Sequence, residues 1–483
     1  MKASSLETGE GPVLQDSLAN AIGTESKRPP MVSECMRALE QFPLNRSLNS
    51  FRWHGNPILE KGAPGEWDEA LIRDPMVFYD YLAPPQERFK VYYSGENANN
   101  EMHIGLAYGS SLEHLTRCPA NPIVRMTEDW ENMRANHNPY VICLPSTGSY
   151  EMLYTARACD QNGRYSYSTG RVTSRDGKNW TNKKQAFTAF KVGGRTYFPQ
   201  KPILHYNVEE STYYLIFAAS LMERKNQKNE GFTGLATSVN GEEYAFERII
   251  IPQDMAGSIY DPHGLVPLLG WYFLLITHDS SYPDDPDGNS NWPERWLVSG
   301  DLRNWYGGPK SVWDTYPDEG FLYSHLSPLV TESGWAYFVY DHGKPNRFCL
   351  AKVPLVGKPY NVVVDCPLVK PGGSTELKEC YPALCLQPGD TVALTVECTY
   401  RAEASRPARV HVYTSYDGED WDTEEQRDAS GRPIFGDLAL RPGNVLRQTT
   451  GLSVGARFIK VTVENPDPNE PICDVKVVAT FGE

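Results

Sequence analysis

The sequence contains no long apolar run, and this absence argues against a membrane-spanning protein. None of its 483 residues lies in a stretch that approaches the ~20 consecutive apolar residues of a transmembrane helix. The longest candidate, residues 265–276, is interrupted by Pro267 and Gly270. The N-terminus, MKASSLETGEGPVLQ, also lacks the apolar segment of a secretory signal. We therefore expect no membrane partner and a cytoplasmic location.

The sequence also lacks an excess of positive charge and closely spaced cysteine pairs. The chain has 46 Lys and Arg residues against 61 Asp and Glu residues, which gives a net charge of −15. So acidic a chain is a poor partner for nucleic acid, and none is expected. Ten cysteines are present, but none forms a CxxC pair or a zinc-ribbon spacing. We predict buried free thiols, with a pair between Cys380 and Cys385 as the open alternative.

The most informative feature that is present is an internal repeat. Five prolines each open a short apolar run: Pro75, Pro139, Pro202, Pro262 and Pro328. Their spacings are 64, 63, 60 and 66 residues. An aromatic-rich run follows each one, then a third run and a polar turn, and last a weaker patch such as ERIII (247–251) or NVVV (361–364). Four short strands in each of five units predict a five-bladed β-propeller, and a β-sandwich with coincidental spacing is the alternative.

The repeat also divides the chain. We assign residues 50–365 to the propeller and residues 1–49 to an N-terminal extension, which is partly disordered and has a short helix near residues 32–42. Short alternating runs such as ARVHVYTSYDG and GARFIKVTVEN predict an antiparallel β-sandwich over residues 366–483. The predicted fold class is therefore all-β, a five-bladed propeller followed by a C-terminal sandwich.

The first strand of each blade lines the central channel of a propeller, so the residues before the five prolines should converge on one funnel. These residues are Asp74, Asn138, Lys201, Asp261 and Ser327. Their neighbours add Arg73, His137, Gln200, His263 and His325. Proline fits there because the start of a strand need not donate to the sheet.

Paired carboxylates with histidines in one funnel suggest glycoside hydrolysis. In that reaction one carboxylate acts as base or nucleophile, and an acid protonates the leaving oxygen. The environment must separate the pKa values of the two groups. The simpler alternative is that an Asp before proline only starts a strand or caps a turn. Because five prolines occur in the same context, a functional role is favoured for Asp74 over a role in starting the strand.

The first blade, NPILEKGAPGEWDEALIRDPMVFYD with FKVYYSG and IGLAYGS, resembles that of the five-bladed propeller glycoside hydrolases, the group of families 32, 43, 68, 117 and 130. The resemblance covers about 300 residues and rests on pattern rather than on long identity. In those families an Asp before proline is the catalytic base or nucleophile, and Asp74 matches it. The stretch YSHLSPLVTESGWAYFVYDHG (323–343) resembles the fifth blade of family 43, where an axial histidine, matched by His325, often lies beside a metal ion. The resemblance thus allows a calcium ion on the propeller axis.

The chain departs from family 43 at two positions. The fourth blade reads IYDPHGLV, without the family's Glu before proline, and the Asp of the third blade is replaced by Lys201. The site pattern resembles family 117 more closely. That resemblance implies Asp74 as base, Asp261 as transition-state modulator and His325 as acid, because a histidine titrates near neutrality and a nearby carboxylate can raise its pKa.

Further residues are candidates for binding the substrate. They are Arg73, His137, Asn138, Lys201, His263 and Glu319. Arg73 and Lys201 suit a charged group on a sugar, although Arg73 could instead only hold a neighbouring carboxylate. Glu230 and Glu319 are spare carboxylates that could supply the acid in place of His325.

These observations lead to one predicted function and two alternatives. We predict a glycoside hydrolase that cleaves an oligo- or polysaccharide, with inversion implied by the resemblance. A phosphorylase on the same scaffold is the first alternative, and a non-catalytic glycan-binding propeller is the second. The expected partner is a carbohydrate, and the sequence leaves a homo-oligomer open.

Overall fold

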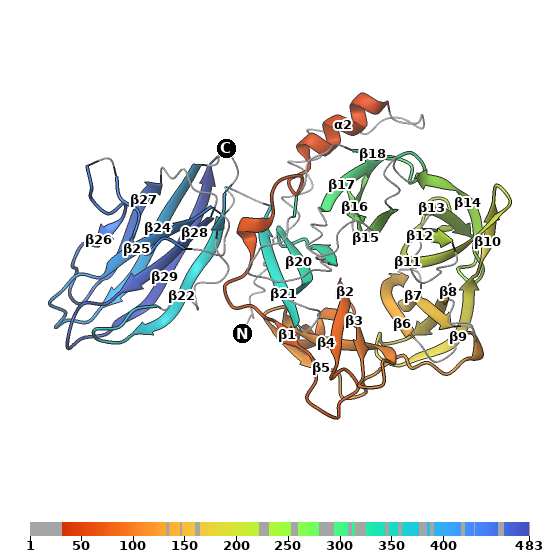
Figure 1. The fold of residues 1–483 in the computed structure, drawn as a ribbon, viewed down its shortest axis with the longest axis horizontal. Coiled ribbons are helices and arrows are strands. Elements are labelled where there is room, and N and C mark those ends of the chain that lie inside the picture. Colours follow the sequence, from red (N-terminus) through yellow and green to blue (C-terminus); the bar gives the residue numbers. More distant parts are fainter. Residues whose placement is uncertain are drawn as a thin grey trace, which may run out of the picture.

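The fold was analysed in a computed structural model of the chain. The structure describes residues 31–131, 135–144, 147–159, 165–221, 231–252, 259–279, 294–307, 312–313, 325–342, 347–355, 360–375, 384–386, 391–416, 421–428, 430–452 and 458–482. Within these ranges the strands form a ring of sheets and, beside the ring, a separate pair of sheets (Figure 1). The all-β prediction is therefore confirmed.

In the described part of the chain the ring consists of four sheets, and the largest joins two antiparallel units through a parallel pairing of Met102 with Ala135, so that five units can be distinguished. The first blade contains β2 (Leu71–Tyr79), β3 (Phe89–Glu96), β4 (Met102–Ser111) and β5 (His114–Arg117), and the second β6 (Ala135–Leu144), β7 (Ser149–Cys159), β8 (Tyr165–Ser174) and β9 (Trp180–Phe187). The third contains β10 (Phe190–Val192), β11 (Arg195–Asn207), β12 (Thr212–Leu221), β13 (Gly231–Ser238) and β14 (Ala245–Ile251). The fourth contains β15 (Ile259–Leu268), β16 (Trp271–Asp279), β17 (Glu294–Ser299) and β18 (Tyr306–Gly307), and the fifth β19 (Leu326–Val330), β20 (Trp335–His342), β21 (Arg347–Pro354) and β1 (Leu59–Glu60). The five repeat prolines lie in β2, β6, β11, β15 and β19, the first long strand of each blade, as the sequence predicts; in the third blade the short strand β10 precedes β11.

The fifth blade is closed by a strand from the other end of the propeller. β1 pairs with β21, with Leu59 opposite Phe348. The predicted fourth strand, NVVV, instead belongs to β22 (Tyr360–Val369), which pairs with β29 (Ile472–Gly482) in the sandwich. That assignment was wrong, because a strand from before the first blade joins the two ends of the ring and leaves residues 361–364 free to start the next sheet. The predicted boundary at 365/366 accordingly falls inside β22.

The first strands of three blades share a bulge at the residue before proline. Asp74, Asn138 and Lys201 have φ angles of 52°, 49° and 52°, in the left-handed region. At each one the register with the second strand shifts. A proline can follow because the bulged position donates nothing to the ladder. Left-handed backbone costs a non-glycine residue about 1–3 kcal/mol and clusters at functional sites.

Side-chain hydroxyls satisfy the amides of these bulges across the blades. Asn138 N–H donates to Ser94 Oγ at 3.2 Å, and Lys201 N–H donates to Thr155 Oγ1 at 2.8 Å. Ser94 and Thr155 lie on β3 and β7, opposite the residue that precedes each blade's own bulge. One blade therefore holds the bulge of the next, which fixes the first strands relative to one another.

In the fourth blade the register shift comes one residue later, between Pro262 and Gly264. His263 is thus the extra residue of this strand. A Cβ atom on Gly264 would lie 2.4 Å from Cδ of Pro328, so only glycine allows β15 and β19 to approach this closely. The bulge and the glycine together bring His263 next to the fifth blade.

The N-terminal helix α2 (Val32–Gln41), near the predicted position, leads into residues that pack on the fourth blade. Phe42 stacks on Phe273 with ring centroids 3.8 Å apart, and Trp296 Nε1 donates to the carbonyl of Leu44 at 3.1 Å. Three short 3₁₀ helices, η1 (Asn49–Phe51), η2 (Pro85–Glu87) and η3 (Asp129–Glu131), complete the helical part that the structure describes. None of these helices is long and apolar enough to cross a membrane.

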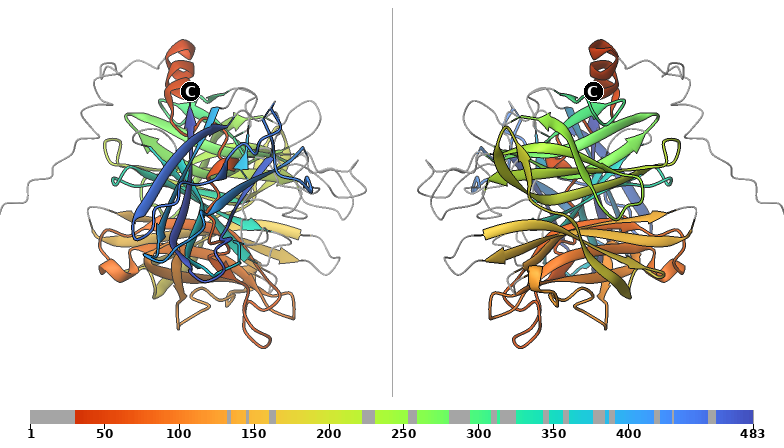
Figure 2. Two further views of the ribbon diagram at one scale, coloured as in Figure 1. Left: turned by 90° about the vertical axis from the view of Figure 1, so that its left-hand side faces the viewer. Right: turned by 90° about the vertical axis from the view of Figure 1, so that its right-hand side faces the viewer.

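The pair of sheets beside the ring forms the predicted sandwich. One sheet has the order β22-β29-β24-β27 and the other β23-β28-β25-β26. The remaining bounds are β23 (Leu384–Cys385), β24 (Thr391–Tyr400), β25 (Arg409–Ser415), β26 (Gly436–Asp437), β27 (Val445–Leu452) and β28 (Phe458–Glu464). The sandwich lies against the segment that enters the propeller (Figures 1 and 2), where Asn361 donates to the carbonyl of Arg52 at 3.1 Å and Phe51 packs on Phe481.

The cysteines whose side chains the structure describes are free thiols: Cys35, Cys118, Cys143, Cys159, Cys349, Cys366, Cys398 and Cys473. The absence of disulfides among these eight residues agrees with the prediction, whereas the predicted burial holds only for Cys35, Cys118, Cys349 and Cys398. The alternative pair of Cys380 and Cys385 lies outside the described side chains.

Candidate active site

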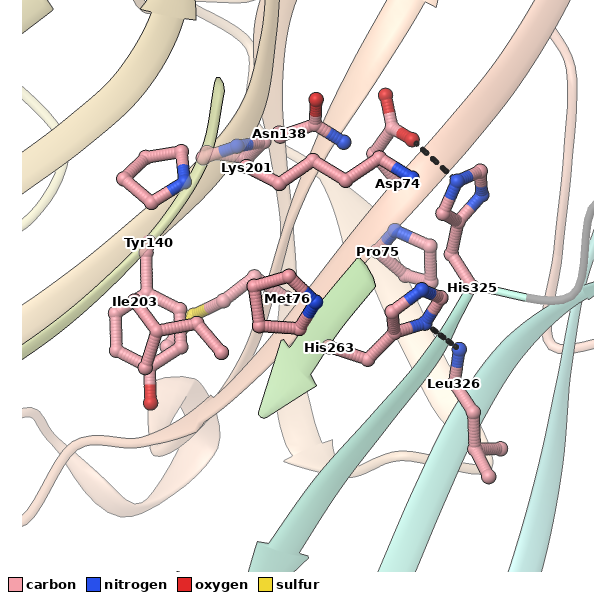
Figure 3. Close-up of a pocket in the computed structure, with 13 residues that line it drawn as sticks. Asp74, Pro75, Met76, Asn138, Tyr140, Lys201, Ile203, His263, His325 and Leu326 are labelled. Carbon is pink, nitrogen blue, oxygen red and sulfur yellow. Dashed lines mark hydrogen bonds and ion pairs between the residues drawn. The ribbon is translucent and has the colours of Figure 1, made fainter. Parts of the chain in front are cut away.

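A pocket opens on the axis where the first strands converge. It is lined by Asp74, Pro75, Met76, Asn138, Pro139, Tyr140, Lys201, Pro202, Ile203, Pro262, His263, His325 and Leu326. Every blade contributes, and Figure 3 shows the side chains facing one another from different strands. In the first four blades the bulges explain this convergence, because each one turns its residue out of the sheet toward the axis.

Asp74 is the most extensively held residue of the pocket. Its Oδ2 accepts a hydrogen bond from Ser94 Oγ at 3.0 Å and lies 3.2 Å from Arg73 Nε. His137 Nδ1 is 3.7 Å from the same oxygen, and His325 Nε2 is 3.3 Å from Oδ1. Residues of three blades therefore orient one carboxylate.

The surroundings keep Asp74 ionised. Burial opposes ionisation, but the charges of Arg73 and His325 and the contact with His137 hold the pKa of this carboxyl well below its ordinary value. Burial also lowers the pKa of His137 to about 4, in spite of the nearby Asp74. At neutral pH the result is a buried carboxylate beside a neutral histidine, with its charge balanced by Arg73.

His325 lies between two carboxylates. Its Nδ1 is 3.0 Å from Oδ2 of Asp341, whose Oδ1 accepts the backbone N–H of His325 at 2.7 Å. Its Nε2 points to Asp74 (Figure 3). Asp341, from β20, is almost fully buried and fixes both the ring and the backbone of His325.

Lys201 and Asp261 form an ion pair between the third and fourth blades. The ammonium group of Lys201 contacts Oδ2 of Asp261, and both side chains are largely buried. Lys201 lines the pocket, while Asp261 stands behind it. The ammonium group of Lys201 therefore lies at the pocket wall, and the carboxylate of Asp261 balances its charge.

His263 stacks on His325 and contacts a buried carboxyl. The two imidazole rings are 5.3 Å apart with an interplanar angle of 18°. His263 Nδ1 accepts the backbone N–H of Leu326 at 3.3 Å and lies 3.2 Å from Oε1 of Glu294. Burial, together with His325 and Lys201, holds the pKa of His263 well below its ordinary value.

The structure brings most of the predicted residues together. Five of them line the pocket: Asp74, Asn138, Lys201, His263 and His325. Three more contact these residues from behind or beside: Arg73, His137 and Asp261. Ser327 instead accepts the backbone N–H of Val77 at 2.9 Å, and Gln200 donates to Ser220 at 3.1 Å. Glu319 and Glu230 lie outside the described residues.

Sequence reasoning missed four polar residues of this region: Asp341, Glu294, Ser94 and Thr155. Ser94, Thr155 and Asp341 each interrupt an aromatic-rich second strand, in YYSG, YTAR and VYDH. A polar residue within an otherwise apolar run was therefore the available signal. Glu294 begins β17 at the end of an acidic run, where it resembles a solvated side chain.

The residues around the pocket do not fit the calcium ion that the resemblance allows. Calcium takes 6–8 oxygen ligands, whereas Lys201 and two imidazole rings occupy the pocket wall. Among the described residues there is no group of three or more His, Cys, Asp or Glu side chains that could hold a metal ion.

Comparison with known proteins gives similarity to solved structures alone. No protein-family model matches the chain, and no curated protein matches it. Among similar solved structures is a family 32 β-fructofuranosidase from Bombyx mori, 13% identical over 91% of this chain and 97% of that one, with a TM-score of 0.47. A sucrose-6-phosphate hydrolase from Lactobacillus gasseri is 12% identical over 94% and 96%, with a TM-score of 0.48.

A third similar structure carries a different activity. It is an N-acetylgalactosamine deacetylase from F. plautii in complex with blood group B trisaccharide, 15% identical over 61% of this chain and 94% of that one, with a TM-score of 0.44. Similarities this remote do not assign a reaction, since one fold hosts many chemistries. The function has to be argued from the pocket itself.

Proposed function

We propose that this protein is a glycoside hydrolase that binds a sugar in the axial pocket and uses Asp74 as its catalytic carboxylate. The observation that carries the proposal is the environment of Asp74. It is a buried carboxylate held ionised by Arg73 and His325 and oriented by a hydrogen bond from Ser94, at a strained backbone position in a pocket. Such an arrangement is costly for folding and suits a base or nucleophile.

Asp74 would act either on a water molecule or on the anomeric carbon itself. As a base it accepts a proton from the attacking water, which leads to inversion, the outcome implied by the family resemblance. As a nucleophile it forms a covalent glycosyl intermediate, which leads to retention. In both cases its low pKa keeps it ready to react at neutral pH.

The distance between His325 and Asp74 favours a positioning role for His325 over the role of acid that the family resemblance implies. The acid and base of an inverting glycosidase stand about 6.5–9.5 Å apart, because the bond and a water molecule lie between them. His325 Nε2 is 3.3 Å from Asp74 Oδ1, in direct contact. We therefore infer that His325, held by Asp341, orients and balances the charge of Asp74. The Lys201–Asp261 pair would supply a hydrogen-bond donor to a sugar hydroxyl from the opposite blades.

The phosphorylase alternative finds less support. A phosphate site needs cations that are available to the phosphate oxygens. In the pocket Lys201 is paired with Asp261, and Arg73 is paired with Asp74. These pairs favour a neutral sugar over an anion at this wall.

The test is a panel of oligosaccharides and aryl glycosides, incubated with the full chain with and without phosphate and analysed by mass spectrometry. We expect hydrolysis products that do not depend on phosphate and that disappear in Asp74→Asn. The matched control is Asp365→Asn, an exposed aspartate of the sandwich strand β22. Sugar phosphates formed only with phosphate would establish the phosphorylase. Sugar binding without any product would establish a glycan-binding propeller.

A further inference from the structure

His263 presents a defined tautomer. The backbone N–H of Leu326 donates to Nδ1 at 3.3 Å, so this nitrogen carries a lone pair and not a proton. The low pKa of His263, which comes from burial and from the nearby His325 and Lys201, keeps the ring neutral. The proton of the ring therefore sits on Nε2. That atom is buried and has no hydrogen-bond partner among the described residues, although His263 lines the pocket.

Glu294 stands behind His263 as a buried carboxyl. Its side chain has an exposed fraction of 0%, and its Oε1 is 3.2 Å from Nδ1 of His263. Within the described part of the chain no side chain donates a hydrogen bond to its oxygens, and the backbone N–H of Leu326, which donates to Nδ1 of His263, also faces them. An ionised carboxylate at this position would face the lone pair of Nδ1, which is repulsive. A protonated carboxyl can instead direct its O–H toward that lone pair, which it then shares with the backbone N–H of Leu326.

The charges that face Glu294 support the protonated form. Burial raises the pKa of Glu294 well above its ordinary value, and the carboxylates of Asp341 and Asp261 add to the effect. Lys201 and the backbone N–H of Leu326 act in the opposite direction. Asp74 and Glu294 are thus two carboxyls of one site whose pKa values are driven apart, the pattern that separates a base from an acid.

We propose that Glu294 and His263 form a proton-delivery pair, in which His263 Nε2–H protonates the leaving oxygen of the sugar and Glu294 supplies the replacement proton through Nδ1. The proposal rests on the proposed function. His263 is the donor that is not already engaged, because Nε2 of the other stacked ring, His325, points to Asp74 (Figure 3). His263 would be a catalytic residue, and Glu294 a positioning residue that acts through it.

The proton balance of this step closes within the site. As the glycosidic C–O bond breaks, the Nε2–H bond breaks and the O–H bond of the leaving alcohol forms. The O–H bond of Glu294 breaks, the Nδ1–H bond forms, and the imidazole stays neutral. The new carboxylate of Glu294 is stabilised by the Leu326 N–H and by Lys201. Asp74 takes the proton of the attacking water and later releases it to solvent. A solvent proton returns to Nε2 of His263 while the Nδ1 proton passes back to Glu294, so all three groups regain their starting states.

The protonation of Glu294 is tested without any substrate. Infrared spectroscopy of the full chain at pH 7 should show the C=O band of a carboxylic acid, and Glu294→Gln should remove it. Glu131 is the matched control, since this glutamate is equally buried, but the backbone N–H groups of Glu128 and Thr127, together with Lys183, lower its pKa. Glu131→Gln should leave the acid band unchanged. An unchanged band in Glu294→Gln would overturn the proposal.

Proton delivery is tested by the leaving group. On an aryl glycoside with a poor leaving group, His263→Asn and Glu294→Gln should each lower kcat/KM by about 100-fold, a typical contribution of general acid catalysis. With a good leaving group, which needs no proton, the losses in both variants should shrink to below about 10-fold. Glu294→Asp keeps a carboxylic acid and should therefore keep part of the activity on the substrate with the poor leaving group. Equal losses on both substrates would overturn the proposal. If wild type cleaves no glycoside while the acid band is present, the proposed function fails and the protonated Glu294 stands.

Discussion

The hydroxyl of Ser94 serves two functions, and its removal should be costly. Ser94 is fully buried, donates to the ionised Asp74 at 3.0 Å and accepts the backbone N–H of Asn138 at 3.2 Å. In Ser94→Ala the buried amide of Asn138 loses its partner, which costs about 1–3 kcal/mol. The carboxylate also loses a hydrogen bond of comparable strength. We expect the free energy of unfolding to fall by about 3 kcal/mol, since Arg73 and His325 still hold Asp74.

Equilibrium urea denaturation, followed by tryptophan fluorescence, measures this loss as a shift of the midpoint at constant slope. The control is Ser110→Ala, which removes an exposed hydroxyl on β4 and should change the free energy of unfolding by less than about 0.5 kcal/mol. If the two alanine variants are equally stable, the bridge between the blades does not hold the bulge, and the reasoning is refuted.

Three further predictions concern the ion pair, the positioning carboxylate and acid stability. Lys201→Met leaves Asp261 buried and unpaired and should destabilise the protein by about 3 kcal/mol in urea denaturation; adding Asp261→Asn should recover most of this loss, and strict additivity would contradict the account. Asp341→Asn releases His325 and should lower kcat about 100-fold with little change in KM, whereas an unchanged kcat would rule out the positioning role. The depressed pKa of Asp74 contributes stability that is complete above the ordinary Asp pKa of about 3.9 and is lost as the pH falls through the folded value, so denaturation between pH 5 and 2.5 should show a shallower acid loss in Asp74→Asn.

The first strands of the blades could be predicted because each repeat unit has a proline at the same place near the start of its first strand. Each proline follows the residue that turns toward the axis, so aligning the prolines also aligned Asp74, Asn138 and Lys201. The closing strand could not be found in this way. β1 is only two residues long, which is too short for an alternating pattern, while residues 361–364 suit an edge strand of either sheet.

The residues behind the pocket wall could not be predicted from the sequence, because their positions depend on contacts between strands that are distant along the chain. Glu294 and His263 are 31 positions apart, and neither has a local pattern that joins them. Glutamate is usually exposed, so its complete burial beside an imidazole follows from the packing of β17 against the axis and not from propensity. Asp341 likewise becomes meaningful only once β20 places it behind His325.

The measurement that tests the central claim most directly is the kcat of Asp74→Asn on whichever glycoside the substrate panel shows to be cleaved. The isosteric amide keeps the shape of the site but removes the charge, so the variant should retain its fold by circular dichroism and lose at least about 10³-fold in kcat. Asp365→Asn, the exposed control, should match wild type. A folded Asp74→Asn variant with the kcat of wild type would contradict the assignment of Asp74 as the catalytic carboxylate.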